Sequence, residues 1–240
     1  MSDTDKQTQT NSKPSMIGKL AMLIILAVLS VGVMGYAGKA AIGNLYVLSL
    51  KSEIKGVESL VQEGIAPSVV DARQLTESVL AWDGDTPSTL TYVASFARWF
   101  DHLLSQSESA QPDSVVGNSS EWIEQAIQRR PTMSNQYLLK AIALWQQGKP
   151  KADIAQQYQL AQQFGPYEKD VALASLEFYL AYWPQLNTEE KVLASQYLLS
   201  PRDYRLGYRE IGRVIQRSPN KHRACSLLSF NNIKIRECKS

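Results

Sequence analysis

Histidine is nearly absent from this chain, whose 240 residues contain only His102 and His222. Neither has a second ligand at the spacing of a zinc motif such as HExxH, and no Cys-x-x-Cys pair occurs. The sequence also lacks a glycine-rich phosphate loop and a G-x-S-x-G nucleophile elbow. We therefore predict no metal, no cofactor and no catalytic residues.

Charged residues are missing from Leu20 to Gly38, a run as long as the roughly 20 apolar residues that cross a bilayer as a helix. We predict a transmembrane helix at residues 16–38, preceded by a polar cytoplasmic tail at residues 1–15. Lysines flank the run on both sides, so they do not set its orientation. The alternative is a signal peptide that is cleaved before Gly38. In both cases the remainder of the chain is exported.

Only two cysteines are present, Cys225 and Cys238. If Asn231-Asn232 forms a two-residue turn, a β-hairpin places them opposite each other, within disulfide reach. The same register puts four apolar side chains on one face: Leu228, Phe230, Ile233 and Ile235. We predict a disulfide-bonded hairpin at residues 219–240, against the alternative of two unrelated thiols in a frayed tail. A lasting disulfide needs an oxidising compartment, which places the C-terminal end outside the cytoplasm.

The segment after the apolar run has a heptad pattern. Five aliphatic residues recur at alternating steps of three and four: Val47, Leu50, Ile54, Val57 and Val61. We predict that the helix continues beyond the membrane into a helical region at residues 39–118. The apolar face either packs against its own domain or forms a homodimer through residues 47–61.

Local signals divide the rest of that region. Ser68 and Asp71 form a capping box for a helix that ends near Trp82, and Asp85-Thr86-Pro87 opens the next helix. Asp83-Gly84-Asp85 lacks the rest of a calcium loop, so we interpret it as a turn and helix cap. Residues 105–119 are polar and contain proline and glycine, as is typical of a linker or exposed loop.

A repeat begins after this loop. Pro131, Pro166 and Pro201 stand 35 residues apart, and the first two follow Ala126 and Ala161 by five residues. This period is typical of helix-turn-helix repeats, and the alanine and proline resemble the end of a tetratricopeptide unit. We predict a degenerate, tetratricopeptide-like array at residues 119–218. Its helices are expected at residues 119–130, 134–147, 151–164, 167–182, 188–199 and 202–217. An ordinary helical bundle with evenly spaced prolines is the alternative.

Positive charge concentrates near the C-terminus. The whole chain has a formal net charge of only +2, but residues 201–240 contain ten Lys/Arg residues and only three Asp/Glu residues. Arginine recurs every four residues on the last predicted helix, and guanidinium groups bind carboxylates and phosphates with paired hydrogen bonds. The candidate anion- or partner-binding residues are Arg202, Arg205, Arg209, Arg213 and Arg217. A merely solvated helix face is the alternative interpretation.

The segment at residues 119–186 resembles the VpsP-type proteins encoded in bacterial exopolysaccharide loci. The resemblance rests on Trp122, Ala126, Pro131, Leu144-Trp145, Gly165-Pro166 and Trp183. It implies a single-pass, mostly α-helical accessory protein in the inner membrane of a Gram-negative bacterium, with its C-terminal domain in the periplasm. No catalytic residues follow from it.

We accordingly predict an all-α, non-enzymatic scaffold of extracellular polysaccharide (biofilm matrix or capsule) biosynthesis or export. Its expected partners are the membrane and either polysaccharide assembly or export proteins or an anionic glycan, but not nucleic acid. One alternative is a periplasmic glycan-processing enzyme, which needs two carboxylates about 5–9 Å apart over a groove. The carboxylates available for it are Asp170, Glu177, Glu189 and Glu190. A second alternative is a tetratricopeptide-like partner of another envelope complex.

Overall fold

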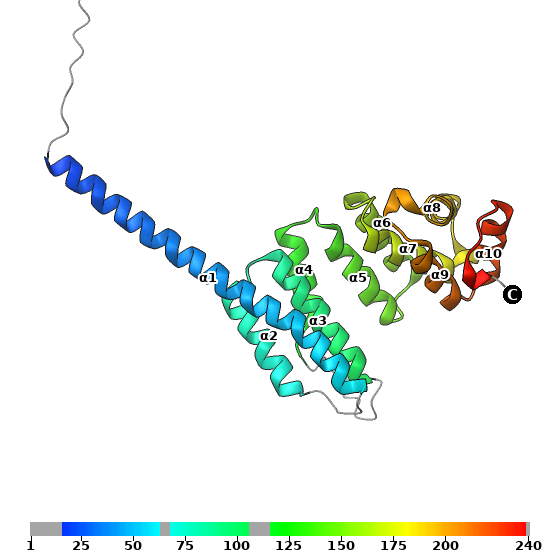
Figure 1. Ribbon diagram of the computed structural model, residues 1–240, viewed down its shortest axis with the longest axis horizontal. Coiled ribbons are helices and arrows are strands. Elements are labelled where there is room, and N and C mark those ends of the chain that lie inside the picture. The colour runs from blue at the N-terminus through cyan, green and yellow to red at the C-terminus, as the bar shows by residue number, and fades with distance from the viewer. Residues whose placement is uncertain (1–15, 63–67, 106–115, 239–240) are drawn as a thin grey trace, which may run out of the picture.

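The computed structural model describes residues 16–62, 68–105 and 116–238. Every regular element within these ranges is a helix, which confirms the predicted all-α class (Figure 1). The α-helices are α1 (Met16–Gln62), α2 (Val69–Asp83), α3 (Pro87–Ser105), α4 (Ser119–Arg129), α5 (Ser134–Gln146), α6 (Lys151–Phe164), α7 (Lys169–Ala181), α8 (Thr188–Leu199), α9 (Tyr208–Arg217) and α10 (Lys221–Phe230). Short 3₁₀ helices lie at Trp183–Gln185, Pro201–Tyr204 and Arg236–Cys238.

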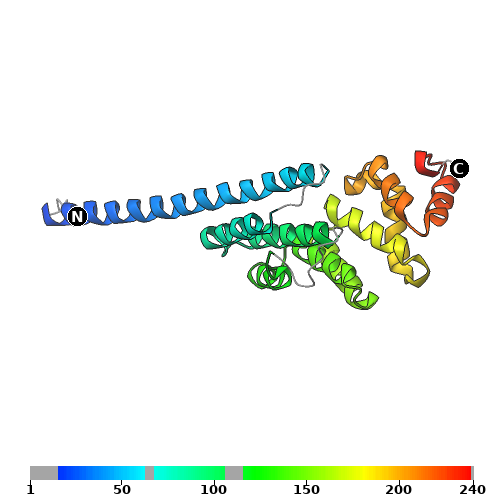
Figure 2. The same cartoon turned by 90° about the horizontal axis from the view of Figure 1, so that it is seen from below.

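Helix α1 is 47 residues long and runs without a break from the apolar segment into the rest of the fold. We call the C-terminal half of α1 together with α2 to α10 the body. The N-terminal half of α1 extends away from all other helices in Figures 1 and 2, and its apolar side chains there are exposed. Among the described residues, Gly18–Glu53 is long and apolar enough to cross a membrane. The predicted continuation of this helix beyond residue 38 is confirmed. The predicted tail at residues 1–15 lies outside the described residues.

The C-terminal half of α1 lies along α2 and α3 and shares a core with them (Figure 2). Val47, Leu50 and Val57 of the predicted heptad pattern are buried in this core together with Val79 of α2 and Phe96 of α3. The side chains of the other two members of the pattern are outside the described set. The apolar face of α1 is thus explained by packing within one chain, and a homodimer through residues 47–61 stays an untested prediction.

Gly43 adds a close contact to the same face of α1. A Cβ atom at this position would lie 2.7 Å from the Cβ of Asp83, whereas one at Gly38 would meet nothing within 4 Å. We expect Gly43→Leu to push α1 away from α2 and to lower the free energy of unfolding by about 1–3 kcal/mol, the usual cost of overpacking. Thermal unfolding of the full chain in lipid nanodiscs measures this change. Gly38→Leu is the matched control, and equal effects of both variants would contradict the proposed contact.

The predicted boundaries between α2 and α3 are confirmed by their hydrogen bonds. The Ser68 side chain accepts a hydrogen bond from the Asp71 amide at the start of α2. Gly84 caps the end of α2, and the Asp83 carboxylate accepts from the hydroxyls of Thr86 and Thr89 at 2.5 Å each. The Asp-Gly-Asp segment therefore serves as a turn and helix cap, as its short length indicated.

The 35-residue period reappears in the helix boundaries. Helices α4, α6 and α8 end at residues 129, 164 and 199, and α5 and α7 begin at residues 134 and 169. Ala126 and Ala161 are fully buried. Antiparallel hairpins are formed by α3 with α4, and through short connections by α5 with α6 and by α7 with α8. Most of the loop predicted at residues 105–119 lies outside the described residues. Gly148, with a φ of 65°, ends α5 in the left-handed conformation that suits glycine.

A second core is shared by all six helices from α5 through α10. The Phe178 ring lies at its centre, stacked on Tyr158 at 4.8 Å and edge-on to Trp145 at 5.5 Å between ring centroids. Tyr158, Tyr179 and Tyr197 are fully buried in the same cluster. Aromatic rings of this size bury a large apolar area, so this cluster is a main source of stability for the array.

The predicted helix at residues 202–217 is broken. A 3₁₀ turn at Pro201–Tyr204 ends in Arg205, whose φ of 56° is left-handed, and α9 begins only at Tyr208. The break buries Leu206 in the core of the array. Gly207 then starts α9, because its amide donates to the Glu210 carboxylate at 3.0 Å.

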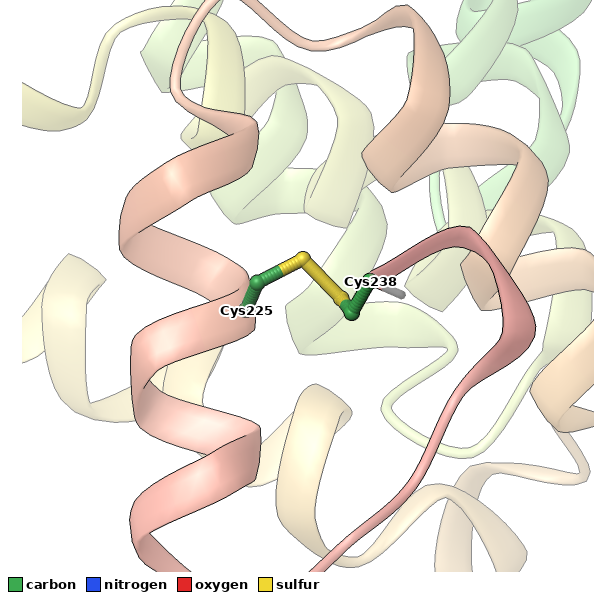
Figure 3. The surroundings of a disulfide bond; sticks show 2 residues. All are labelled: Cys225 and Cys238. Carbon is green, nitrogen blue, oxygen red and sulfur yellow. A yellow bond between two sulfur atoms is a disulfide. The ribbon is translucent and has the colours of Figure 1, made fainter. Parts of the chain in front are cut away.

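The predicted C-terminal β-hairpin is wrong in its secondary structure. Residues 221–230 form α10, followed by an irregular segment, although the predicted pair Cys225–Cys238 is disulfide-bonded with a Cα–Cα distance of 5.4 Å (Figure 3). Asn232 does have the predicted left-handed φ, at 58°, but it ends a helix: the next amide, of Ile233, donates to the Leu228 carbonyl at 2.9 Å. An isolated two-stranded hairpin is only marginally stable, whereas α10 packs on α8 and α9.

The predicted apolar face of that hairpin is only partly retained. Leu228 and Ile235 are buried and Ile233 is half-buried, but Phe230 is 86% exposed at the end of α10. The reason is geometric, since a helix turns the side chain two positions after Leu228 to another face.

Candidate functional site

A groove crosses the first helices of the three hairpins, α3, α5 and α7. It has a volume of about 260 Å³ and is lined by Ser88, Thr91, Tyr92, Ser95, Met133, Asn135, Leu138, Leu139, Ile142 and Asp170. We call it the three-helix groove. This groove was not predicted from the sequence. A signal was nonetheless present, because Asn135 and Asp170 occupy equivalent positions in the 35-residue repeat, each second in its helix.

The floor of the three-helix groove is apolar. Leu138 is buried and Leu139 and Ile142 are half-buried along one face of α5. On the α3 side, the hydroxyls of Thr91 and Ser95 donate to carbonyls of their own helix at 2.8 Å. These hydroxyl protons are therefore already used, and the floor favours apolar side chains over polar ones.

Two exposed side chains give the three-helix groove its polar character. The Tyr92 ring is 45% exposed, and the ammonium group of Lys51 on α1 lies 4.1 Å from its centroid. The Asp170 carboxylate, in the first turn of α7, is exposed and forms no ion pair with any residue that the structure describes. An apolar floor with one aromatic ring and one unpaired carboxylate suits an extended segment with apolar and basic side chains.

The predicted arginine surface is less regular than the sequence indicated. Arg209, Arg213 and Arg217 lie on α9, but Arg205 lies in the left-handed turn before it and Arg202 in the preceding 3₁₀ turn. The five side chains therefore do not form one row along a helix. All five are exposed.

Acidic partners offset part of this positive charge. Arg217 pairs with Glu177 at 3.1 Å, and Lys169 pairs with Glu210 at 2.6 Å. The pKa of Glu210 is held below its usual range, chiefly by the hydrogen bond from Lys169 and also by the Gly207 amide and the charge of Arg213. Among the described residues, no ion pair involves Arg202, Arg205, Arg209 or Arg213. This surface remains a candidate for anions, with four arginines available.

The four carboxylates considered for glycan chemistry serve at separate places. Glu190 is buried, caps α8 through the Asn187 amide and pairs with Lys151 at 3.3 Å. Glu177 pairs with Arg217, Glu189 is exposed in the first turn of α8, and Asp170 lies in the three-helix groove. Among the residues that the structure describes, Asp170 is the one acid that lines this groove. These residues therefore do not supply the pair of acids that glycoside hydrolysis requires.

A wider, open cleft of about 710 Å³ lies beside the disulfide. Both cysteines line it, together with Lys221, His222 and Glu237. The disulfide holds the C-terminal segment against α10, and Glu237 of this segment approaches Gly212 of α9. The described parts of the chain contain no cluster of His, Cys, Asp and Glu that could hold a metal ion.

Comparison of the chain with protein-family models, with curated proteins and with solved structures gave no match.

Proposed function

We propose that the protein is a non-enzymatic, membrane-anchored scaffold whose helical body binds an extended segment of a partner protein in the three-helix groove. The observation that carries this proposal is that the first helices of three successive hairpins line one groove. Helices that recur every 35 residues, with a buried alanine before the first two joints, favour a tetratricopeptide-like array. Arrays of this kind present continuous binding surfaces that no single hairpin provides.

The proposed location follows from two features of the chain. Helix α1 is long and apolar enough to cross a membrane, and the Cys225–Cys238 disulfide favours an oxidising compartment for the body. The resemblance to VpsP-type proteins implies the inner membrane of a Gram-negative bacterium, and we propose that α1 lies in that membrane with the body in the periplasm.

The pathway is proposed from the resemblance to VpsP-type proteins. The resembling segment, residues 119–186, contains α5 and α7 and supplies six of the ten residues that line the three-helix groove. We propose that the partner belongs to the machinery that makes or exports an extracellular polysaccharide. The basic surface around Arg209 is a second candidate site, for an anionic glycan.

Photo-cross-linking separates the two surfaces. With benzoylphenylalanine at Tyr92, we expect a discrete adduct whose yield falls at least tenfold in Asp170→Lys, because reversing the charge opposes a basic side chain of the partner. Asp153→Lys is the matched control, since Asp153 is also exposed in the first turn of its helix, α6, but outside the groove. An adduct that survives Asp170→Lys and disappears in the Arg205→Glu, Arg209→Glu, Arg213→Glu triple variant would instead assign binding to the arginines.

A further inference from the structure

Helix α1 connects the membrane to the three-helix groove without a flexible linker. It continues as one helix from the end of the apolar run at Gly38 to the buried Gly43, Val47 and Leu50. Only four residues separate Gly38 from Gly43, the first residue of α1 that is buried in the body. The position of the body above the bilayer is therefore set by the helix itself.

The rise per residue of an α-helix gives the height of the three-helix groove above the membrane. Lys51 is thirteen residues beyond Gly38, which at 1.5 Å per residue is about 20 Å along the axis. Its ammonium group lies over Tyr92, a lining residue of the three-helix groove, and side chains in a helix lean toward its N-terminus. A tilt of α1 in the membrane lowers the height further. The Tyr92 side of the groove thus lies within about 20 Å of the apolar layer from which α1 emerges.

We infer that the segment bound in the three-helix groove is juxtamembrane, belonging to a partner anchored in the same membrane. This inference rests on the proposed function and specifies its partner. An extended chain advances about 3.3 Å per residue, so six residues cover the 20 Å and about ten reach along the groove. The segment carries a basic side chain for the unpaired Asp170 carboxylate and apolar side chains for the floor formed by Leu139 and Ile142.

The rigid connection favours such a partner for an entropic reason. Two proteins anchored in one membrane already share a plane, so a groove held at fixed height meets a juxtamembrane segment at a high effective concentration. A flexible linker would spread the groove over many heights and lose this advantage. A soluble partner gains nothing from a fixed height, and the nearby bilayer blocks part of its approach.

An insertion that lengthens α1 tests the inference. Eighteen helix-forming residues placed between Lys39 and Ala40 add five full turns, which raise the groove by about 27 Å without rotating the body. With the cross-linker at Tyr92 in full-length protein in cell membranes, we expect the adduct yield to fall at least tenfold. A seven-residue insertion, which adds about 10 Å, is expected to reduce it less. The same eighteen residues inserted within the tail at 1–15 are the matched control and should leave the yield unchanged.

The second measurement is mass spectrometry of the adduct formed by the chain that has the cross-linker at Tyr92 but no insertion. We expect the cross-linked peptide to come from an integral membrane protein, within about ten residues of its membrane-spanning segment. A peptide from a soluble protein, or a yield that does not depend on α1 length in folded variants, would overturn the inference but not the proposed function. If the chain without an insertion fails to form a cross-link from Tyr92, both the inference and the proposed function are overturned.

Discussion

Above pH 10 the free energy of unfolding will fall steeply, because three tyrosines of the second core ionise more readily in the unfolded chain. Tyr158, Tyr179 and Tyr197 are fully buried. Burial raises the pKa of Tyr179 to about 12, against a lowering effect of its hydrogen bond with Gln162. Burial also raises the pKa of Tyr158 and Tyr197, with smaller contributions from Glu177 beside Tyr158 and from neighbouring tyrosines.

The sign follows from the protons that each state holds. Below pH 10 a tyrosine is neutral in both the folded and the unfolded chain, so its contribution to stability is fully present. Above pH 10 the unfolded chain releases the proton while the folded chain keeps it, so stability falls by about 1.4 kcal/mol per tyrosine and pH unit. By pH 12 three such groups remove about 8 kcal/mol, comparable to the whole stability of a typical domain.

Circular dichroism and absorbance at 295 nm between pH 8 and 12 measure this loss together. We expect three of the eleven tyrosines to ionise only as the helices unfold. Tyr158→Phe and Tyr179→Phe should each remove about a third of the slope. Ionisation of all eleven tyrosines before the circular dichroism changes would contradict the prediction.

The same two core variants should differ at neutral pH. The Tyr179 hydroxyl is hydrogen-bonded to the Gln162 side chain, so Tyr179→Phe is expected to cost about 1 kcal/mol. The buried Tyr158 hydroxyl has no hydrogen-bond partner among the described residues. Tyr158→Phe should therefore leave stability unchanged or raise it, since it removes a buried polar group without breaking a bond.

Loss of the disulfide is expected to lower the free energy of unfolding by about 3 kcal/mol, the chain-entropy value for a closed loop of this size. The bond joins residues 13 positions apart and holds Ile235 in the second core. In the Cys225→Ser, Cys238→Ser double variant the C-terminal segment can leave this core. For a chain of this length we expect the melting temperature to drop by about 6–12 °C.

Thermal unfolding of the full chain in lipid nanodiscs, with and without reductant, checks the size of this effect. Reductant should lower the melting temperature of the wild type to that of the double variant and leave the double variant unchanged. Alkylation of intact cells before extraction checks the compartment, because a body in the periplasm should yield no free thiol at Cys225 or Cys238. Free thiols in such a sample would contradict both the disulfide and the proposed location.

The helices of the array were predictable because their signals are local. The predicted ends of α4, α6 and α8 agree with the structure to within one residue, since proline or glycine follows each or comes soon after. The cysteine pair was predicted correctly from an incorrect hairpin. The chain has only two cysteines, so within the chain neither has another partner. The left-handed asparagine that suits a hairpin turn equally suits the end of a helix.

The groove was not predictable in the same way. Tyr92, Leu139 and Asp170 are far apart in the sequence and come together only because α3, α5 and α7 lie side by side. The prediction of a single row of arginines was wrong for a related reason. Four-residue spacing predicts one helix face only where the helix is continuous, and burial of Leu206 in the core interrupts it at Arg205.

The amino-acid sequence by itself determined the all-α class, the long apolar helix and its continuation into the body, the 35-residue period and the pairing of the two cysteines. These features depend on hydrophobic periodicity, caps and breakers, which act between residues a few positions apart. Only the tertiary structure decided how the C-terminal segment folds, which arginines lie together, and that three helices form a groove beside Lys51 of α1. These outcomes depend on which distant surfaces bury one another, and that free energy is not contained in any single stretch of the chain.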